Sequence, residues 1–215
     1  MFEQWRGSID GFFEQWFPTS CVRCGSLGGS PCSSCIGELE AAASIKQIPS
    51  LDQVAALVRY DEISRPFIAD LKFRGGWSVV RTLAPALSFL LDDIAATHHP
   101  DTVLTWAPTT PERVRYRGFD QAEVVTRELA RQSGHRVQRL LRRLPGVHQT
   151  GRNRAERSQG VHFAALGRVP QVVVVVDDVV TTGSTMAAAA SVLRDAGAAT
   201  VLGLALAATP DRTMS

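Results

Sequence analysis

Lysine is scarce in this 215-residue chain: Lys46 and Lys72 are the only lysines among 23 basic residues, so nearly all positive charge is arginine. A net charge of +2 does not by itself indicate an acidic partner. No apolar run approaches the roughly 20 residues that a membrane-spanning helix requires. Acids at Glu3 and Asp10 do not fit a signal peptide, so a cytoplasmic location is expected by default. The composition, 45% hydrophobic and 20% charged, is that of a globular protein with one sizeable core.

Cysteine is absent outside residues 21–35, where two C-x-x-C pairs are separated by seven residues. This spacing suits a tetrahedral Zn²⁺ site. The alternative is two disulfides, which require an oxidising compartment. Four thiolates leave no position for a catalytic water, so the expected role of the zinc is structural, and so short a segment is expected to need the metal. The predicted ligands are Cys21, Cys24, Cys32 and Cys35.

The organising stretch of the chain is a valine run from Val172 that continues into two acids, two valines and Thr-Thr-Gly-Ser-Thr. A β-branched run that is apolar on both faces is typical of a central strand in a parallel sheet covered by helices on both sides. An alanine- and leucine-rich segment from Met186 to Leu193 follows, with Gly197 placed to end a helix. The pattern predicts an α/β fold whose loop lies at the carboxyl end of the strand, where open sheets bind ligands.

This loop carries the chemistry of a ribose 5-phosphate site. Backbone N–H groups at a helix N-terminus attract a phosphate, and a glycine allows its close approach. Two adjacent carboxylates suit sugar hydroxyls or a hydrated Mg²⁺ instead. The alternative is a buried strand followed by an ordinary capped helix. The candidate binding residues are Asp177, Asp178, Thr181, Thr182, Gly183, Ser184 and Thr185.

The remaining elements are assigned from periodicity and turn residues. Strands are expected at 54–60, 103–107 and 200–208, and helices at 66–73, 81–95 and about 118–132, the last with Asp120 as N-cap and Glu123 as its capping-box partner. A loop after Pro108 is expected to carry Arg113, Arg115 and Arg117. A repeated Phe-Glu-Gln-Trp in residues 1–20 favours an aromatic helix that packs on the rest of the chain. Residues 148–160 lie in an arginine-rich part and lack an apolar period, which favours a mobile loop over the site.

Residues 173–185 resemble the ribose-phosphate fingerprint of type I phosphoribosyltransferases. Four further stretches resemble the ComF (ComF/GntX) family: Phe17-Pro18 before the cysteines, and residues 71–75, 115–121 and 149–163. The resemblance covers nearly the whole chain. It implies a type I phosphoribosyltransferase fold (residues 46–215) with an N-terminal zinc module (residues 1–45), and a link to competence and DNA uptake. The family usually has Asn where this chain has Asp120 and Gln159, which puts the identity or affinity of the ligand in question.

Two functions follow as hypotheses. The first is an enzyme that transfers phosphoribosyl from PRPP, with Mg²⁺, to an acceptor; cations for the pyrophosphate would come from Arg117, Arg115, Lys72 and Arg74. Purine-salvage members commonly have Asp at the position of Thr181, which disfavours a purine acceptor. The alternative is a non-catalytic module that binds a nucleotide or single-stranded DNA, together with DNA-uptake proteins.

Overall fold

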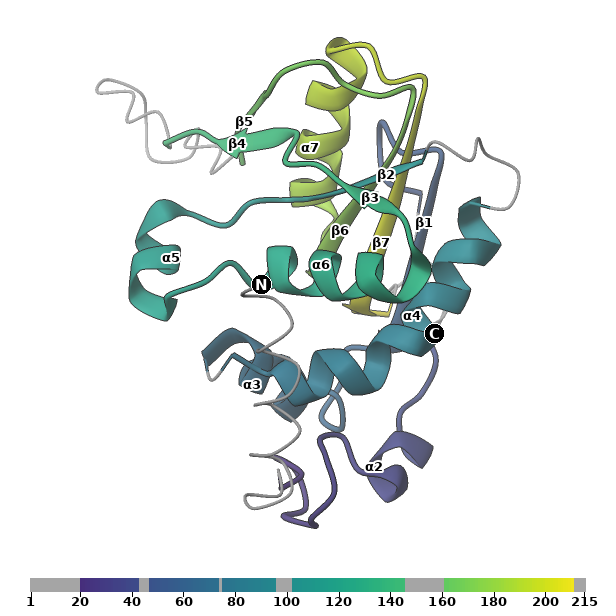
Figure 1. Ribbon diagram of the computed structural model, residues 1–215, viewed down its shortest axis with the longest axis vertical. Helices are drawn as coiled ribbons and strands as arrows, with labels where there is room; N and C mark the ends of the chain where they lie inside the picture. Colours follow the sequence, from purple (N-terminus) through teal and green to yellow (C-terminus); the bar gives the residue numbers. More distant parts are fainter. Residues whose placement is uncertain (1–19, 43–46, 74, 96–101, 146–160, 211–215) are drawn as a thin grey trace, which may run out of the picture.

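The computed structural model describes residues 20–42, 47–73, 75–95, 102–145 and 161–210. At its centre is a five-stranded sheet in the order β1-β7-β6-β2-β3, in which every neighbouring pair is parallel (Figure 1). The predicted fold class, an open parallel sheet with helices on both faces and a small N-terminal cysteine module, is confirmed. The strands are β1 (Gln53–Arg59), β2 (Val103–Trp106), β3 (Arg136–Val137), β6 (Val172–Val180) and β7 (Thr200–Ala208).

Strand β6 forms the middle of the sheet because its side chains are apolar on both faces. Residues 173–176 are completely buried, with β7 on one side and β2 on the other. Alternation along the strand sends Val174 and Val176 into one apolar cluster and Val173 and Val175 into a second. The valine run therefore supplies the contact surface for both helical layers.

The helices divide between the two faces of the sheet. The first cluster joins the sheet to α3, α4 and α6, and the second joins it to α7 and to a two-stranded antiparallel hairpin (Figure 1). The helices are α3 (Arg65–Phe73), α4 (Trp77–Ala95), α6 (Gln121–Ser133) and α7 (Ser184–Asp195), and the hairpin consists of β4 (Leu141–Arg143) and β5 (Phe163–Ala165). No helix in these described segments is long and apolar enough to span a bilayer.

The expected loop after Pro108 was wrong in part, because its arginines lie on a short helix, α5 (Pro111–Arg117). Thr110 caps this helix by accepting a hydrogen bond from the Arg113 N–H at 3.3 Å, and Pro111 occupies its first turn. Gly118 ends it in a left-handed conformation with φ of 83°. Start and stop signals were thus present, but the absence of an apolar face concealed the helix.

The cysteine module packs on the start of α4. It contains the short helix α2 (Ser33–Gly37). The backbone N–H of Ser30, a fully buried residue, donates to Ser78 Oγ at 3.0 Å. Cys21 and Cys35 share an apolar cluster with residues of α3 and α4. The predicted aromatic helix falls in residues 1–19, outside the described segments, as does the predicted mobile loop at 148–160 with Gln159.

Candidate functional site

The loop between β6 and α7 encloses a small hollow lined by Asp177 and residues 179–186. Gly183 is the N-cap of α7, has no side chain to cap the helix, and is followed by a first turn without acidic residues. Thr182 Oγ1 donates to Ser184 Oγ at 3.0 Å and accepts a long bond from the Ser184 N–H at 3.4 Å. The hollow therefore combines backbone N–H groups, hydroxyls and the positive end of a helix dipole, the properties of an anion site. The structure brings residues 181–185 together with Asp177 around it.

The Ile48 side chain, rather than a bound phosphate, leaves no room for a larger residue at position 183. A Cβ on Gly183 would lie 2.6 Å from Ile48 Cδ1 and 2.8 Å from its Cγ1, and the backbone has φ of +75°. Both the left-handed backbone and the packing against Ile48 require glycine here. Sequence reasoning had assigned this glycine to close approach of a phosphate, and the Ile48 contact could not be read from local sequence.

The two acids of the fingerprint lie within β6 rather than in the loop, because the strand continues to Val180. Consecutive strand residues point to opposite faces. Asp177 lines the hollow, whereas Asp178 is only 5% exposed and faces α3. The Asp177 and Asp178 carboxylates each accept the N–H of the following residue, at 2.8 Å and 3.0 Å respectively. The two carboxyl groups remain close neighbours, but of the two acids only Asp177 lines the hollow, whereas Asp178 pairs with Lys72.

Lys72, which sequence reasoning placed with the pyrophosphate cations, forms an ion pair with Asp178. Its Nζ lies 3.1 Å from Asp178 Oδ2, and the two side chains are 26% and 7% exposed. Apart from this ion pair, the buried Asp178 Oδ2 accepts no hydrogen bond from the described residues. Arg74, another predicted cation, lies outside the described residues.

The carboxyl group of Asp177 sits in an unfavourable environment for a charge. Burial, followed by the neighbouring charge of Asp178, raises its pKa well above 3.8. Arg143 of β4 is an opposing charge within range. Arg143 donates to the Pro108 carbonyl at 3.3 Å and lies 5.7 Å from the centre of the Phe163 ring. The sequence showed this residue only as one of many arginines, because its position depends on the pairing of β4 with β5.

Arg117 lies at the end of α5 with part of its guanidinium unsatisfied. It stacks 5.1 Å from the centre of the Phe73 ring and donates from Nη1 to Gln121 Oε1 at 2.9 Å. Its Nε is buried and has no hydrogen-bond partner among the described residues. Arg115, by contrast, is exposed and pairs with Glu112 at 3.3 Å. Of the two arginines, Arg117 is the one held in a fixed orientation with donor capacity to spare.

Asp120 connects the segment after β2 to the start of α6. Its Oδ2 accepts the Thr109 N–H at 2.8 Å, and its Oδ1 accepts the Ala122 N–H at 3.1 Å. The predicted N-cap is therefore confirmed. Glu123, predicted as its capping-box partner, forms an ion pair with Arg127 at 2.7 Å. Both Asp120 oxygens face donors, which explains why a carboxylate rather than an amide fits this position.

The four cysteines form one cluster in which all Sγ atoms lie within 4.8 Å of one another. Cys21 and Cys35 are 3.7 Å apart, Cys24 and Cys32 are 3.5 Å apart, and all four are free thiols. A tetrahedral zinc with Zn–S bonds of about 2.3 Å separates its sulfurs by about 3.8 Å. The sulfur spacing of the cluster is therefore close to that of a four-coordinate metal site.

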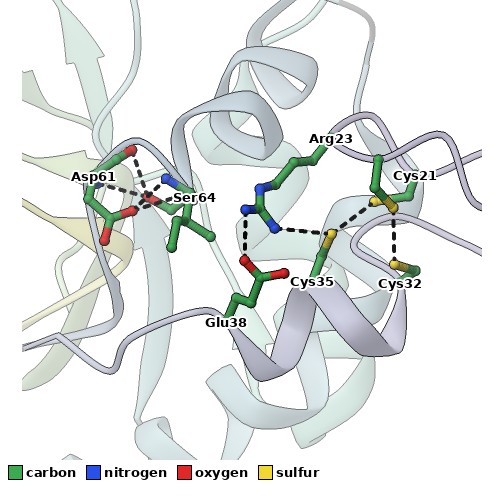
Figure 2. Close-up of polar contacts among 9 residues, drawn as sticks. Cys21, Arg23, Cys32, Cys35, Glu38, Asp61 and Ser64 are labelled. Carbon is green, nitrogen blue, oxygen red and sulfur yellow. Dashed lines mark hydrogen bonds and ion pairs between the residues drawn. The ribbon is translucent and has the colours of Figure 1, made fainter.

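Arg23 supplies a positive charge beside this cluster. Figure 2 shows its guanidinium between Glu38 and Cys35; Nη2 lies 2.7 Å from the Glu38 carboxylate and Nη1 lies 3.5 Å from Cys35 Sγ. Burial alone would raise the pKa of the Cys21 thiol, but hydrogen bonds from the backbone of Cys24, Cys32 and Arg23 outweigh it and lower this pKa to about 6. The pKa of the neighbouring Cys35 thiol is instead raised to about 12: its hydrogen bond with Arg23 lowers this pKa, but burial and the other three cysteines outweigh it.

No protein-family model and no curated protein matches the chain. Among solved structures, it is similar to phosphoribosylpyrophosphate synthetase from Mycobacterium smegmatis, with 23% identity and a TM-score of 0.37 over 59% of this chain and 33% of that one. A similarity to an allosteric regulatory enzyme of purine biosynthesis has 25% identity and a TM-score of 0.37, over 60% of this chain and 26% of that one. The chain thus spans about a third and about a quarter of these two proteins.

A third similar structure is the purine phosphoribosyltransferase from Pyrococcus horikoshii Ot3. The identity is 17% and the TM-score 0.35, over 61% of this chain and 74% of that one.

Proposed function

We propose that the hollow after β6 binds PRPP or another ligand with a ribose 5-phosphate group. The observation that carries this proposal is the placement of the fingerprint: its hydroxyls, its helix N-terminus and Asp177 surround one hollow at the carboxyl end of a central parallel strand. The phosphate would lie on the N–H groups of residues 182–185, where the helix dipole favours an anion. Asp177 would accept hydrogen bonds from the ribose hydroxyls.

The reaction we propose is transfer of phosphoribosyl from PRPP to a non-purine acceptor, which makes the protein a phosphoribosyltransferase. Arg117, whose guanidinium is held by Phe73 and Gln121, is the principal cation proposed for the pyrophosphate, and Arg115 is a second one. A Mg²⁺ bound with PRPP would reduce the negative charge of the pyrophosphate, and Asp177 is an oxygen ligand that the hollow offers to it. Thr181 lacks the carboxylate that would assist a purine ring proton.

The metal that we propose for the cysteine cluster is Zn²⁺, in a structural role. All four Sγ atoms lie within 4.8 Å of one another, and thiolate ligands suit zinc. Arg23 would offset part of the negative charge of four thiolates. We also propose that the chain consists of a zinc module (residues 1–45) and a phosphoribosyltransferase-like domain (residues 46–215). The proposed location of the protein is the cytoplasm.

A second candidate is a ComF-type, non-catalytic module for a nucleotide or single-stranded DNA, acting with DNA-uptake proteins. The observation that favours it is the exposure of aromatic side chains beside Arg117: Phe73 is 62% exposed and Tyr116 is 83% exposed. Exposed aromatic rings next to arginine are suited to stacking with bases.

Calorimetry with ribose 5-phosphate, PRPP with Mg²⁺, and plain ribose tests the shared core of both proposals. We expect the two phosphorylated ligands to bind and ribose to bind far more weakly. Thr185→Ala should weaken the phosphorylated ligands, whereas Ser191→Ala, at an exposed position of the same helix, serves as the control. Absence of ribose 5-phosphate binding at millimolar concentration would refute the proposal.

The two candidates differ in turnover. Release of pyrophosphate from PRPP in the presence of amines and non-purine bases indicates the enzyme. Binding of single-stranded DNA that weakens steeply between two salt concentrations, without pyrophosphate release, indicates the module.

A further inference from the structure

The ion pair between Lys72 and Asp178 connects α3 to the strand that carries the candidate ribose site. Asp178 Oδ1 accepts the Val179 N–H at 3.0 Å, and Oδ2 lies 3.1 Å from the Lys72 ammonium, its ion-pair partner. Asp178 is 5% exposed. Its burial, rather than a lack of acceptor capacity, is what keeps this carboxylate from a ligand in the hollow.

The helix that carries Lys72 is fixed in place. Phe67 and Leu71 of α3 are 1% and 0% exposed and belong to the same apolar cluster as Val176 of β6. The Lys72 side chain is itself about three-quarters covered. Its ammonium is therefore held against β6 rather than directed to the solvent-facing arginines of α5.

Asp177 differs from Asp178 in its position relative to the hollow. Asp177 lines the hollow with residues 179–186, and Asp178 is not among the residues that line it. The two carboxyl groups remain close neighbours, because the charges of Asp178 and Lys72 both act on Asp177.

We propose that Lys72 is a positioning residue of the ribose site: its ion pair with Asp178 fixes the end of β6 and leaves Asp177 as the single fingerprint carboxylate that contacts the ligand. This rests on the proposed binding of ribose 5-phosphate. It assigns different roles to two adjacent acids: Asp177 contacts the ligand, and Asp178 forms the ion pair with Lys72. It also removes Lys72 from the cations that contact pyrophosphate.

Four variants of the full-length protein test these roles: Lys72→Met, Asp178→Asn, the double variant that combines them, and Asp177→Asn. For each, the dissociation constants of ribose 5-phosphate and of PRPP with Mg²⁺ are measured on folded protein, beside thermal unfolding. Arg59→Met, which breaks the exposed pair with Glu40, is the control. Lys72→Arg tests rescue by a conservative change.

We expect Asp177→Asn to weaken both ligands about tenfold or more while the protein stays folded. Lys72→Met leaves a buried carboxylate unpaired, so it should lower the unfolding temperature and weaken both ligands by the same factor. The double variant removes both charges, so its unfolding temperature and its affinity for both ligands should return most of the way to the parent values. Lys72→Arg should do the same. A purely structural pair would change the unfolding temperature but not the affinity of the folded protein.

Three results would overturn the proposal. One is a loss of PRPP affinity in Lys72→Met with ribose 5-phosphate unaffected, which makes Lys72 a direct pyrophosphate contact. Another is a loss in Asp178→Asn as large as in Asp177→Asn that the double variant does not recover, which makes Asp178 a ligand contact. If the parent protein binds neither ligand, the proposed function fails and this inference fails with it.

Discussion

The cysteine module and the β6–α7 region place their candidate binding groups by opposite means. In the module, Cys24 is exposed, α2 has five residues, and Cys35 is the buried residue of that helix. In the β6–α7 region, four consecutive valines are completely buried and Met186 anchors the following helix. We expect the first region to depend on a bound metal for its shape, and the second to owe its shape to the apolar core. Stability and binding should therefore be coupled in the first region and separable in the second.

Metal removal should give the largest effect, and it should be confined to the module. Structural zinc sites are worth on the order of 10–16 kcal/mol in apparent binding free energy at neutral pH. We expect one zinc per chain in protein purified without added metal, and after chelation a loss of amide protection across residues 21–35, including the Ser30 N–H that bonds Ser78.

The sheet supplies the control for this experiment. Amide protection in β6 and β7 should survive chelation, because their hydrogen bonds depend on the apolar core. Protein without zinc that contains two disulfides, or a sheet that unfolds together with the module, would contradict the comparison.

Gly183→Val should damage the β6–α7 region and spare the module. The expected cost is about 2–4 kcal/mol, because a left-handed backbone and a collision with Ile48 are both involved. Gly134→Val is the matched control: its φ is also +75°, but its Cβ meets nothing within 4 Å. Chemical denaturation should show the larger loss at Gly183, and Ile48→Ala in the same chain should reduce it. Equal losses at the two glycines would show that Ile48 does not matter.

Asp120→Asn should lower stability by about 1–3 kcal/mol, although it restores the residue usual in the resembling family. The amide can accept from one of the two donors, Thr109 N–H and Ala122 N–H, but its NH₂ group then faces the other. Asp120→Ser, which retains only a capping acceptor, is the comparison variant. Urea unfolding that finds Asp120→Asn as stable as the parent would show that the second acceptor is dispensable.

Arg117→Ala should change binding more than stability. The loss of a charge-assisted hydrogen bond to an anion is expected to cost PRPP affinity on the order of 1–3 kcal/mol. Arg115→Ala should cost less, since this side chain is exposed and already paired with Glu112. Calorimetry with PRPP ranks the two. An unchanged affinity for both PRPP and single-stranded DNA in Arg117→Ala would remove this residue from the site.

The smallest change in the free energy of unfolding is expected from Glu128→Gln. This residue lies on α6, outside both regions, so the variant provides a reference for the larger effects. Burial opposes the ionised form of Glu128, but Arg131 at 2.6 Å outweighs it and lowers the pKa of Glu128 below 4.5. A lowered folded-state pKa gives stability above the unfolded-state pKa that is lost as the pH falls through the folded-state value. The free energy of unfolding of the variant should be lower by about 0.3–0.5 kcal/mol at neutral pH. It should equal that of the parent at a pH below both the folded-state and the unfolded-state pKa.

Patterns that are local in the chain predicted most of the fold. The valine run gave the central strand, the apolar periodicity gave α6, and the cysteine spacing gave a cluster that the structure confirms. Residues 181–185 also lie where the pattern placed them, at the end of β6 and the start of α7. In each case the pattern that made the prediction lies within a short stretch of sequence.

What the sequence did not show depends on contacts between distant segments. Ile48 lies against Gly183, Lys72 against Asp178, and Arg143 against the Pro108 carbonyl. Each of these contacts needs the order of the strands, which no local pattern contains.

The strand order has a consequence for synthesis on the ribosome. β1 lies at one edge of the sheet, and its neighbour there is β7, which ends at Ala208. β1 leaves the ribosome early, and residues 40–42 can form hydrogen bonds along one side of it. Its other side has to wait for β7, which is synthesised after all the other strands. During that interval this side is an unpaired edge that can associate with other chains. Chaperone demand during translation, rather than the stability of the finished protein, is where this arrangement should be most apparent.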